Sequence, residues 1–117
     1  MRVALRCSIE QLEPGLVIVD GGAERFVASG FIDITARDPS GVLVAIEIKT
    51  GAAGQRAVAQ VLSCMGDLAN EEGTGGRVRG ILVAADFETK ALAAAKMVPN
   101  LLLRRYQVNF QFAEASL

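Results

Sequence analysis

The sequence predicts an α/β fold in which a mixed central β-sheet is flanked by helices, built as one domain over residues 1–117. Three observations favour this class. Two β-type runs meet at a turn near residue 40, a long amphipathic helical pattern follows them, and strand and helix patterns then alternate towards the C-terminus. A composition that is 51% hydrophobic and 21% charged is ordinary for such a domain. The expected element order is α-β-β-β-α-β-α-β.

The first thirty residues are expected to supply a short helix and two short strands. Residues 2–12 mix apolar and polar positions without a clear period, and Pro14-Gly15 ends whatever helix they form. A β-branched run at residues 16–19 and a return at residues 24–28 predict two strands. The Asp20-Gly21-Gly22 sequence between them is typical of a tight turn.

The next two strands are expected to form an antiparallel hairpin from residues 31–36 and 42–48. The five residues between these runs are rich in turn formers. If the hairpin closes about residues 39–40, positions whose numbers add up to about 80 face each other, as Asp33 and Glu47 do. Directly opposed residues on one face have Cβ atoms roughly 4.5–5.5 Å apart. The hairpin therefore predicts two adjacent carboxylates, with Lys49 two residues further along the same face.

The second half of the chain alternates helix and strand patterns. Apolar residues recur at helical spacing over residues 55–72, and a glycine-rich break follows them. Residues 78–85 then predict a buried strand, residues 88–98 an alanine-rich helix, and residues 101–103 and 108–112 further strands. The last run alternates Val108, Phe110 and Phe112 with polar residues.

Several function classes are excluded by what the sequence lacks. It contains no histidine, which excludes Ser-His-Asp and Cys-His nucleophiles and histidine-based zinc hydrolysis within this chain. Cys7 and Cys64 do not have metal-site spacing, so reduced cysteines are expected. No apolar run approaches the roughly 20 residues that cross a bilayer, and the N-terminus lacks a signal-peptide pattern, so we expect a cytoplasmic protein without membrane contact. A net charge of −1 does not by itself indicate nucleic-acid binding.

The Asp33, Glu47 and Lys49 set can be interpreted in two ways. Two carboxylates side by side form a site for Mg²⁺ or Mn²⁺, with the backbone carbonyl of Ile48 as a third oxygen ligand. Lys49 could then orient or help to deprotonate an attacking water. Alternatively, Glu47 and Lys49 form a solvated ion pair at a strand end and Asp33 simply faces a turn.

Several segments together resemble the nuclease domain of the NucS endonucleases, within the PD-(D/E)XK nuclease superfamily. The resemblance runs from about residue 13 to Phe112 and implies a restriction-endonuclease-like core. Its segments are Glu13-Pro14-Gly15-Leu16, residues 30–34, 38–41 and 43–49, Ala57-Val58-Ala59-Gln60, and residues 79–83.

The resemblance implies that Asp33 and Glu47 are metal ligands and that Lys49 is the catalytic lysine. It also implies that Gln60, on the helix behind the hairpin, helps to order the active site. Arg56, one helical turn before Gln60, is either a phosphate contact or an ordinary surface charge.

Three features depart from the family pattern. Cys64 occupies the position where the family usually has a tyrosine. The first helix, which carries an acidic residue facing the site in the family, is short here, and it leaves Glu10 and Glu13 as candidates for that role. The resemblance does not include the separate N-terminal domain with which NucS proteins dimerise and bind DNA.

These observations lead to the expectation of a metal-dependent DNA endonuclease that cuts by direct attack of a metal-activated water. The alternative is a nuclease-fold module that binds DNA or a partner protein without cutting. A homodimer that covers the apolar strand at residues 108–112 is a further expectation. Four arginines are candidates for a basic rim that contacts DNA: Arg77, Arg79, Arg104 and Arg105.

Overall fold

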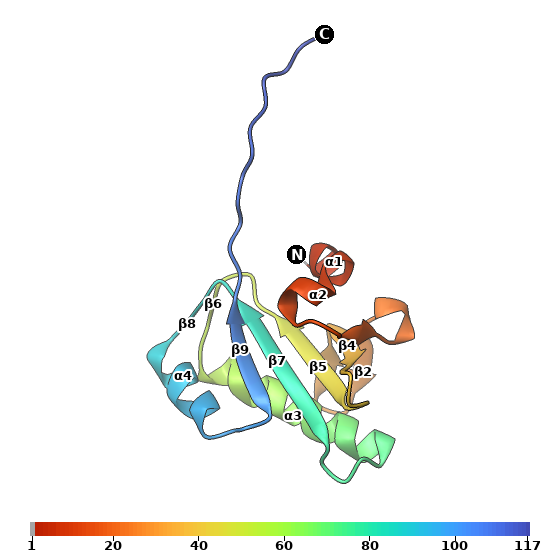
Figure 1. The fold of residues 1–117 in the computed structure, drawn as a ribbon. Coiled ribbons are helices and arrows are strands. Elements are labelled where there is room, and N and C mark those ends of the chain that lie inside the picture. Colours follow the sequence, from red (N-terminus) through yellow and green to blue (C-terminus); the bar gives the residue numbers. More distant parts are fainter. Residues whose placement is uncertain (1) are drawn as a thin grey trace.

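The computed structural model describes residues 2–117 and shows a mixed five-stranded sheet with helices packed against it (Figure 1). The strand order is β1-β4-β5-β7-β9. This architecture confirms the predicted fold class. The helical elements are α1 (Arg2–Cys7), α2 (Ile9–Leu12), η1 (Asp20–Gly22), α3 (Gln55–Glu72) and α4 (Thr89–Lys96). The strands are β1 (Val17–Ile18), β2 (Arg25–Val27), β3 (Gly30–Ile32), β4 (Ile34–Arg37), β5 (Leu43–Ile48), β6 (Ala52–Ala53), β7 (Val78–Ala84), β8 (Asp86–Phe87) and β9 (Leu101–Arg105).

The hairpin of β4 and β5 forms in the predicted register. Ile34 pairs with Ile46 and Arg37 pairs with Leu43, so opposed positions add up to 80. The predicted single strand over residues 31–36 is wrong, however, because the chain bends at Asp33 and divides into β3 and β4. Ile32 packs in the cluster under α3, whereas Ile34 packs in the cluster on the other face of the sheet. The bend thus lets one run of residues serve both faces.

The expected hairpin between residues 16–19 and 24–28 does not form. Instead β1 pairs with β4, and β2 pairs with β3 in a separate two-stranded sheet. A 3₁₀ turn separates β1 from β2, and its three residues all have positive φ, including Asp20 at 57°. The turn does change the direction of the chain, but β1 and β2 then pair with β4 and β3, respectively, and not with each other.

The second half of the chain follows the predicted pattern closely. The helix predicted over residues 55–72 is α3, and it ends at Gly73 in the left-handed conformation that glycine adopts readily. Strands β5, β7 and β9 run parallel to one another, with α3 and α4 contributing to one core cluster. Residues of α2 contribute to the cluster on the opposite face. A short parallel pair, β6 with β8, connects the loops beyond β5 and β7.

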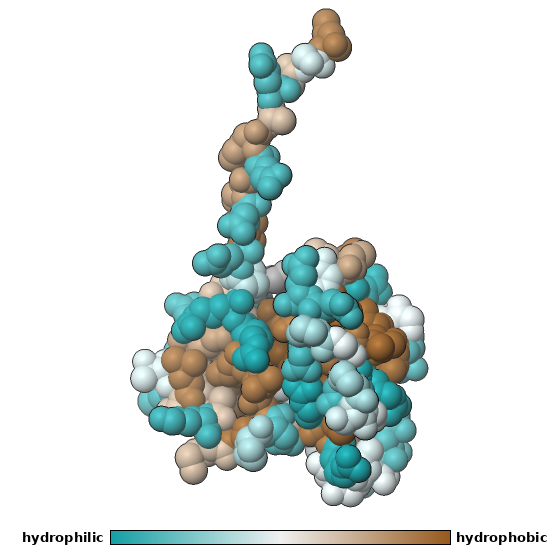
Figure 2. Space-filling model, in the orientation of Figure 1, coloured by the Kyte–Doolittle hydropathy of each residue, from teal (hydrophilic) through white to brown (hydrophobic). Residues whose placement is uncertain are grey.

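The C-terminal segment from residue 107 onwards is extended and pairs with no strand of the described chain, so the predicted strand at residues 108–112 is wrong. It leaves the body of the molecule in Figure 1, and Figure 2 shows that hydrophobic and hydrophilic residues alternate along it. Phe110 and Phe112 are 77% and 92% exposed and stack only on each other. The homodimer expected to cover this segment stays a prediction.

Within residues 2–117, no helix combines the length and the apolar character that crossing a lipid bilayer requires.

Candidate metal centre and catalytic pocket

The two predicted carboxylates meet where β4 and β5 open towards the C-terminal end of β5. Continuing the β4–β5 register by one residue puts Asp33 opposite Glu47. The Oδ2 atom of Asp33 accepts a hydrogen bond of 2.8 Å from the backbone amide of Ile48. This bond holds the Asp33 carboxylate against the end of β5, although Asp33 itself lies in the bend between two strands.

Glu47 is held in an environment that opposes its negative charge. Burial, followed by the nearby charge of Asp33, raises the pKa of Glu47 to about 8. Its Oε1 atom is inaccessible to solvent and has no hydrogen-bond partner in the described part of the chain. An unpaired buried carboxylate oxygen is costly unless a proton or a cation satisfies it.

The donor atoms at this place fit a hard divalent cation. Both side chains offer oxygen, which Mg²⁺ and Mn²⁺ prefer, and Mg²⁺ usually keeps several waters besides one or two carboxylates. No cluster of three or more metal-binding His, Cys, Asp or Glu side chains occurs among residues 2–117. Two carboxylates are therefore the side-chain ligands available here, and the Ile48 carbonyl stays a predicted third ligand.

Glu47 also faces an open pocket of about 430 Å³ between the end of β5 and the first turns of α3. Lys49, which directly follows β5, is exposed and lines this pocket, as does Gln60. Asp33 does not line the pocket, and it lies beside Glu47 in the bend between β3 and β4. The pocket lining consists of Glu47, Ile48, Lys49, Arg56, Ala57, Gln60 and Leu82.

Gln60 holds the β2–β3 hairpin. Its side-chain amide donates a 3.0 Å hydrogen bond to the carbonyl of Ser29 and lies 3.5 Å from the sulfur of Cys64. Cys64 is fully buried, and burial raises the pKa of its thiol. The Gln60 contacts observed here are thus structural, while its role in ordering the active site stays a prediction.

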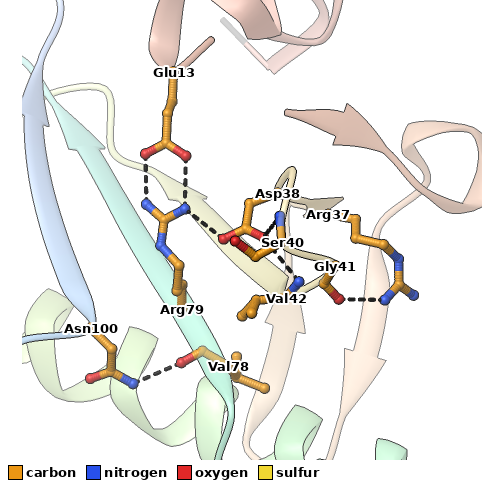
Figure 3. Close-up of polar contacts among 9 residues, drawn as sticks. All are labelled: Glu13, Arg37, Asp38, Ser40, Gly41, Val42, Val78, Arg79 and Asn100. Carbon is orange, nitrogen blue, oxygen red and sulfur yellow. Dashed lines mark hydrogen bonds and ion pairs between the residues drawn. The ribbon is translucent and has the colours of Figure 1, made fainter. Parts of the chain in front are cut away.

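Glu13, one of the two candidates for the acidic residue that faces the site, is engaged elsewhere, near the start of β7. Figure 3 shows its carboxylate paired with Arg79 through two contacts of 2.6 and 2.7 Å, and Arg79 also reaches Asp38 at 3.2 Å. The hydrogen bond from Arg79 lowers the pKa of Glu13. Arg79 lies near the start of β7, opposite Val44 of β5, and is not available as part of a basic rim.

The other sequence candidates are dispersed. Glu10 is exposed on α2. Arg105 pairs with Asp86 at 2.9 Å on the surface. Arg77 borders a different pocket near the turn between β4 and β5. Arg104 lies on β9, where its guanidinium group donates a hydrogen bond to the carbonyl of Leu103. With Arg79 engaged by Glu13 and Asp38, and Arg105 by Asp86, the four arginines do not form one free basic rim.

A third carboxylate that sequence reasoning missed is Glu24. Its charge adds to the forces that raise the pKa of Glu47, and it forms a 2.7 Å ion pair with Arg2. The pairing of Arg25 with Ile32 explains its position, because the same register extended by one residue puts Glu24 opposite Asp33. Pairing residues 24–28 with residues 30–33 in the sequence would have revealed it.

Comparisons with known proteins agree on one family. The family described as the endonuclease NucS C-terminal domain matches residues 3–110. A search of curated proteins found no match to this chain.

Solved structures give the same result. A repair endonuclease from Pyrococcus abyssi superposes with a TM-score of 0.78 at 26% identity, over 90% of this chain and 44% of its own. EndoMS in its apo form superposes with a TM-score of 0.72 at 27% identity, over 92% of this chain and 44% of its own. EndoMS in a complex with double-stranded DNA superposes with a TM-score of 0.70 at 26% identity, over 91% of this chain and 46% of its own. The chain thus spans less than half the length of these relatives.

Proposed function

The chain belongs to the family of endonuclease NucS C-terminal domains, and on that premise we propose that it is a Mg²⁺- or Mn²⁺-dependent DNA endonuclease domain that hydrolyses phosphodiester bonds. The observation that carries the proposal is the Asp33–Glu47 pair: the Oε1 atom of Glu47 is buried without a partner in the described chain, and Glu47 lines a pocket together with Lys49. DNA as the substrate is supported by the relatives, since one is a repair endonuclease and two are structures of EndoMS, one of them in complex with double-stranded DNA.

The bound metal ion would neutralise the phosphoryl oxygens and lower the pKa of a water that becomes the nucleophile. Asp33 and Glu47 would hold that ion at the edge of the pocket. The hydrogen bond from the Ile48 amide keeps Asp33 in place before the ion arrives, so little reorganisation is needed on binding.

Lys49 is the residue best placed to act on the attacking water. It follows Glu47 by two residues and lines the same pocket, where its ammonium group can donate a hydrogen bond to that water and offset negative charge that develops on the phosphate. The structure offers no histidine for this task, because the sequence contains none. In this proposal, cutting proceeds by direct attack of water on the phosphate, without a covalent intermediate on the protein.

The test is cleavage of plasmid, single-stranded and branched DNA with Mg²⁺ or Mn²⁺. We expect Asp33→Asn and Glu47→Gln each to lower the cleavage rate by about 100-fold or more, because each removes a charged ligand. Asp86→Asn is the matched control, since it removes an exposed carboxylate on the surface. Cleavage that survives both site substitutions would refute the mechanism.

Calorimetric titration with Mn²⁺ separates this proposal from a module that binds DNA without cutting. We expect one ion per chain at millimolar concentration or below, and none in Glu47→Gln. Absence of binding to the unmodified protein would favour the non-cutting module.

A further inference from the structure

Helix α3 presents a column of side chains that holds the β2–β3 hairpin. Gln60 donates to the Ser29 carbonyl, and Asp67 accepts a 2.6 Å hydrogen bond from the Ser29 amide. Further along, Glu71 and Glu72 pair with Arg25 of β2 at 3.3 and 2.8 Å. From Gln60 to the end of α3, the polar side chains of this column are therefore engaged by the hairpin.

Arg56 lies on the same column, four residues before Gln60, but beyond the reach of the hairpin. Its side chain is exposed and lines the catalytic pocket with Glu47 and Lys49. Among residues 2–117, no hydrogen bond or ion pair engages its side chain. The column thus continues into the pocket with the Arg56 guanidinium group, which makes no polar contact that would stabilise the described fold.

This contrasts with most arginines of the chain. Arg25 and Arg79 each contact two carboxylates, and Arg105 contacts one. A guanidinium group presents a planar fork of donors that matches two oxygens of a phosphate group, while a lysine acts as a point charge. Within the pocket, Lys49 adjoins the metal ligand Glu47 on the strand, whereas Arg56 comes from the helix on the other side of the lining.

We propose that Arg56 binds a backbone phosphate of the DNA strand that lies in the catalytic pocket and so fixes the register of that strand against Asp33 and Glu47. This inference rests on the proposed nuclease function. It assigns the two cations of the pocket different tasks: Lys49 acts at the phosphate that reacts, and Arg56 holds the strand. Phosphate contacts of this kind position the nucleic acid and carry no base preference.

The experiment compares Arg56→Gln and Arg56→Lys with Arg77→Gln. Arg77 is a matched control because it is also an exposed arginine whose side chain has no partner in the described chain, but it borders the pocket at the opposite end of β5. Binding of a fluorescent oligonucleotide is measured by anisotropy in EDTA over a series of salt concentrations. Circular dichroism melting curves verify that each variant is folded.

We expect Arg56→Gln to weaken DNA binding by roughly 5- to 10-fold and to reduce the slope of log K against log salt by about 0.7–0.9, the value for one lost phosphate contact. Arg56→Lys should keep the salt slope, because the positive charge remains. It should lose part of the affinity, because lysine lacks the planar fork of donors that contacts two phosphate oxygens. Arg77→Gln should match the unmodified protein. A slope unchanged in Arg56→Gln, or reduced equally in Arg77→Gln, would overturn the assignment, as would an unmodified protein that does not bind DNA.

Cleavage assays keep this inference separate from the nuclease proposal. If the unmodified protein cleaves DNA, Arg56→Gln should raise KM more than it lowers kcat, and an unchanged KM would overturn the role of Arg56 alone. If the unmodified protein binds DNA without cutting, a reduced salt slope in Arg56→Gln would uphold the phosphate contact while the nuclease proposal fails.

Discussion

The two ends of strand β5 each bring two carboxylates together, and they treat them in opposite ways. Near the start of β5, Glu13 and Asp38 share Arg79, and the pKa of Glu13 is lowered (Figure 3). At the end of β5, Glu47 lies beside Asp33 without an arginine, and its pKa rises to about 8. The first pair is neutralised by an arginine of the fold. In the second pair, the Oε1 atom of Glu47 has no partner within the described chain.

This difference separates a structural cluster from a binding site more clearly than composition does. Both clusters are acidic and partly buried, and Glu13 belongs to a segment that matches the family pattern. What distinguishes them is whether each carboxylate oxygen has a partner within the protein. An arginine that satisfies both carboxylates removes any need for a ligand, whereas an unpaired buried oxygen creates that need.

The largest expected effect on stability comes from removing the arginine of the first cluster. Arg79→Met should destabilise the protein by about 2–4 kcal/mol, because Glu13 and Asp38 then remain close together without a counter-charge. Urea unfolding followed by far-ultraviolet circular dichroism measures this. Arg105→Met, which breaks an ion pair on the surface, should change the midpoint little. Equal effects of the two substitutions would contradict the structural role of the Arg79 cluster.

A smaller effect with the opposite sign is expected at the second cluster. Because the pKa of Glu47 in the folded protein is raised above its unfolded value, the metal-free protein loses stability as the pH rises from about 5 to 8, and the loss is complete above the folded pKa. Glu47→Gln cannot ionise and should avoid this loss. We expect it to be more stable than the unmodified protein by about 1–3 kcal/mol at pH 8.5, a range reduced because Glu47 is only partly buried.

Unfolding curves at pH 5 and pH 8.5, both in EDTA, test this expectation. The two proteins should have similar stability at pH 5, where Glu47 is protonated in the folded state. Glu10→Gln is the control, since Glu10 is exposed on α2. A stability difference that does not change with pH would show that Glu47 is ionised in the folded protein despite its surroundings.

The smallest effect concerns the loop that follows Lys49. The hydroxyl of Tyr106 donates a 2.7 Å hydrogen bond to the carbonyl of Thr50. Tyr106→Phe should cost about 0.5–1.5 kcal/mol of stability and should lower kcat severalfold with little change in KM, because the lysine is held less firmly. Amide hydrogen exchange of the backbone at residues 50–51 provides an independent measurement, and unchanged exchange would argue against the tether.

Local patterns in the sequence were sufficient for the hairpin and the long helix. The β4–β5 register follows from the turn at residues 37–41, and α3 has the bounds that its apolar spacing predicts. The Asp33–Glu47 pair could be predicted for the same reason, since a two-strand register fixes which side chains face each other.

What the sequence could not supply depends on contacts between distant segments. Ile32 and Ile34 are two residues apart and would lie on the same face of an unbroken strand. Here Ile32 packs under α3 and Ile34 packs on the other face of the sheet, and the bend at Asp33 makes this possible. The turn at Asp20 sends β2 to β3 and not back to β1, which brings Glu24 near the site. The alternation at residues 108–112 predicted a strand, but β-type alternation forms a strand only when an edge is available to pair with it.

The direction in which the C-terminal segment leaves the fold has a practical consequence. Because the Tyr106 hydroxyl is bonded to the Thr50 carbonyl, the extended segment leaves the fold next to the loop that follows Lys49. A fluorophore attached at Phe110→Cys, in a Cys7→Ser background that removes the other exposed thiol, would sit on this exposed segment while Cys64 stays buried. Energy transfer to a labelled oligonucleotide would then report DNA binding in real time, without altering any residue of the pocket.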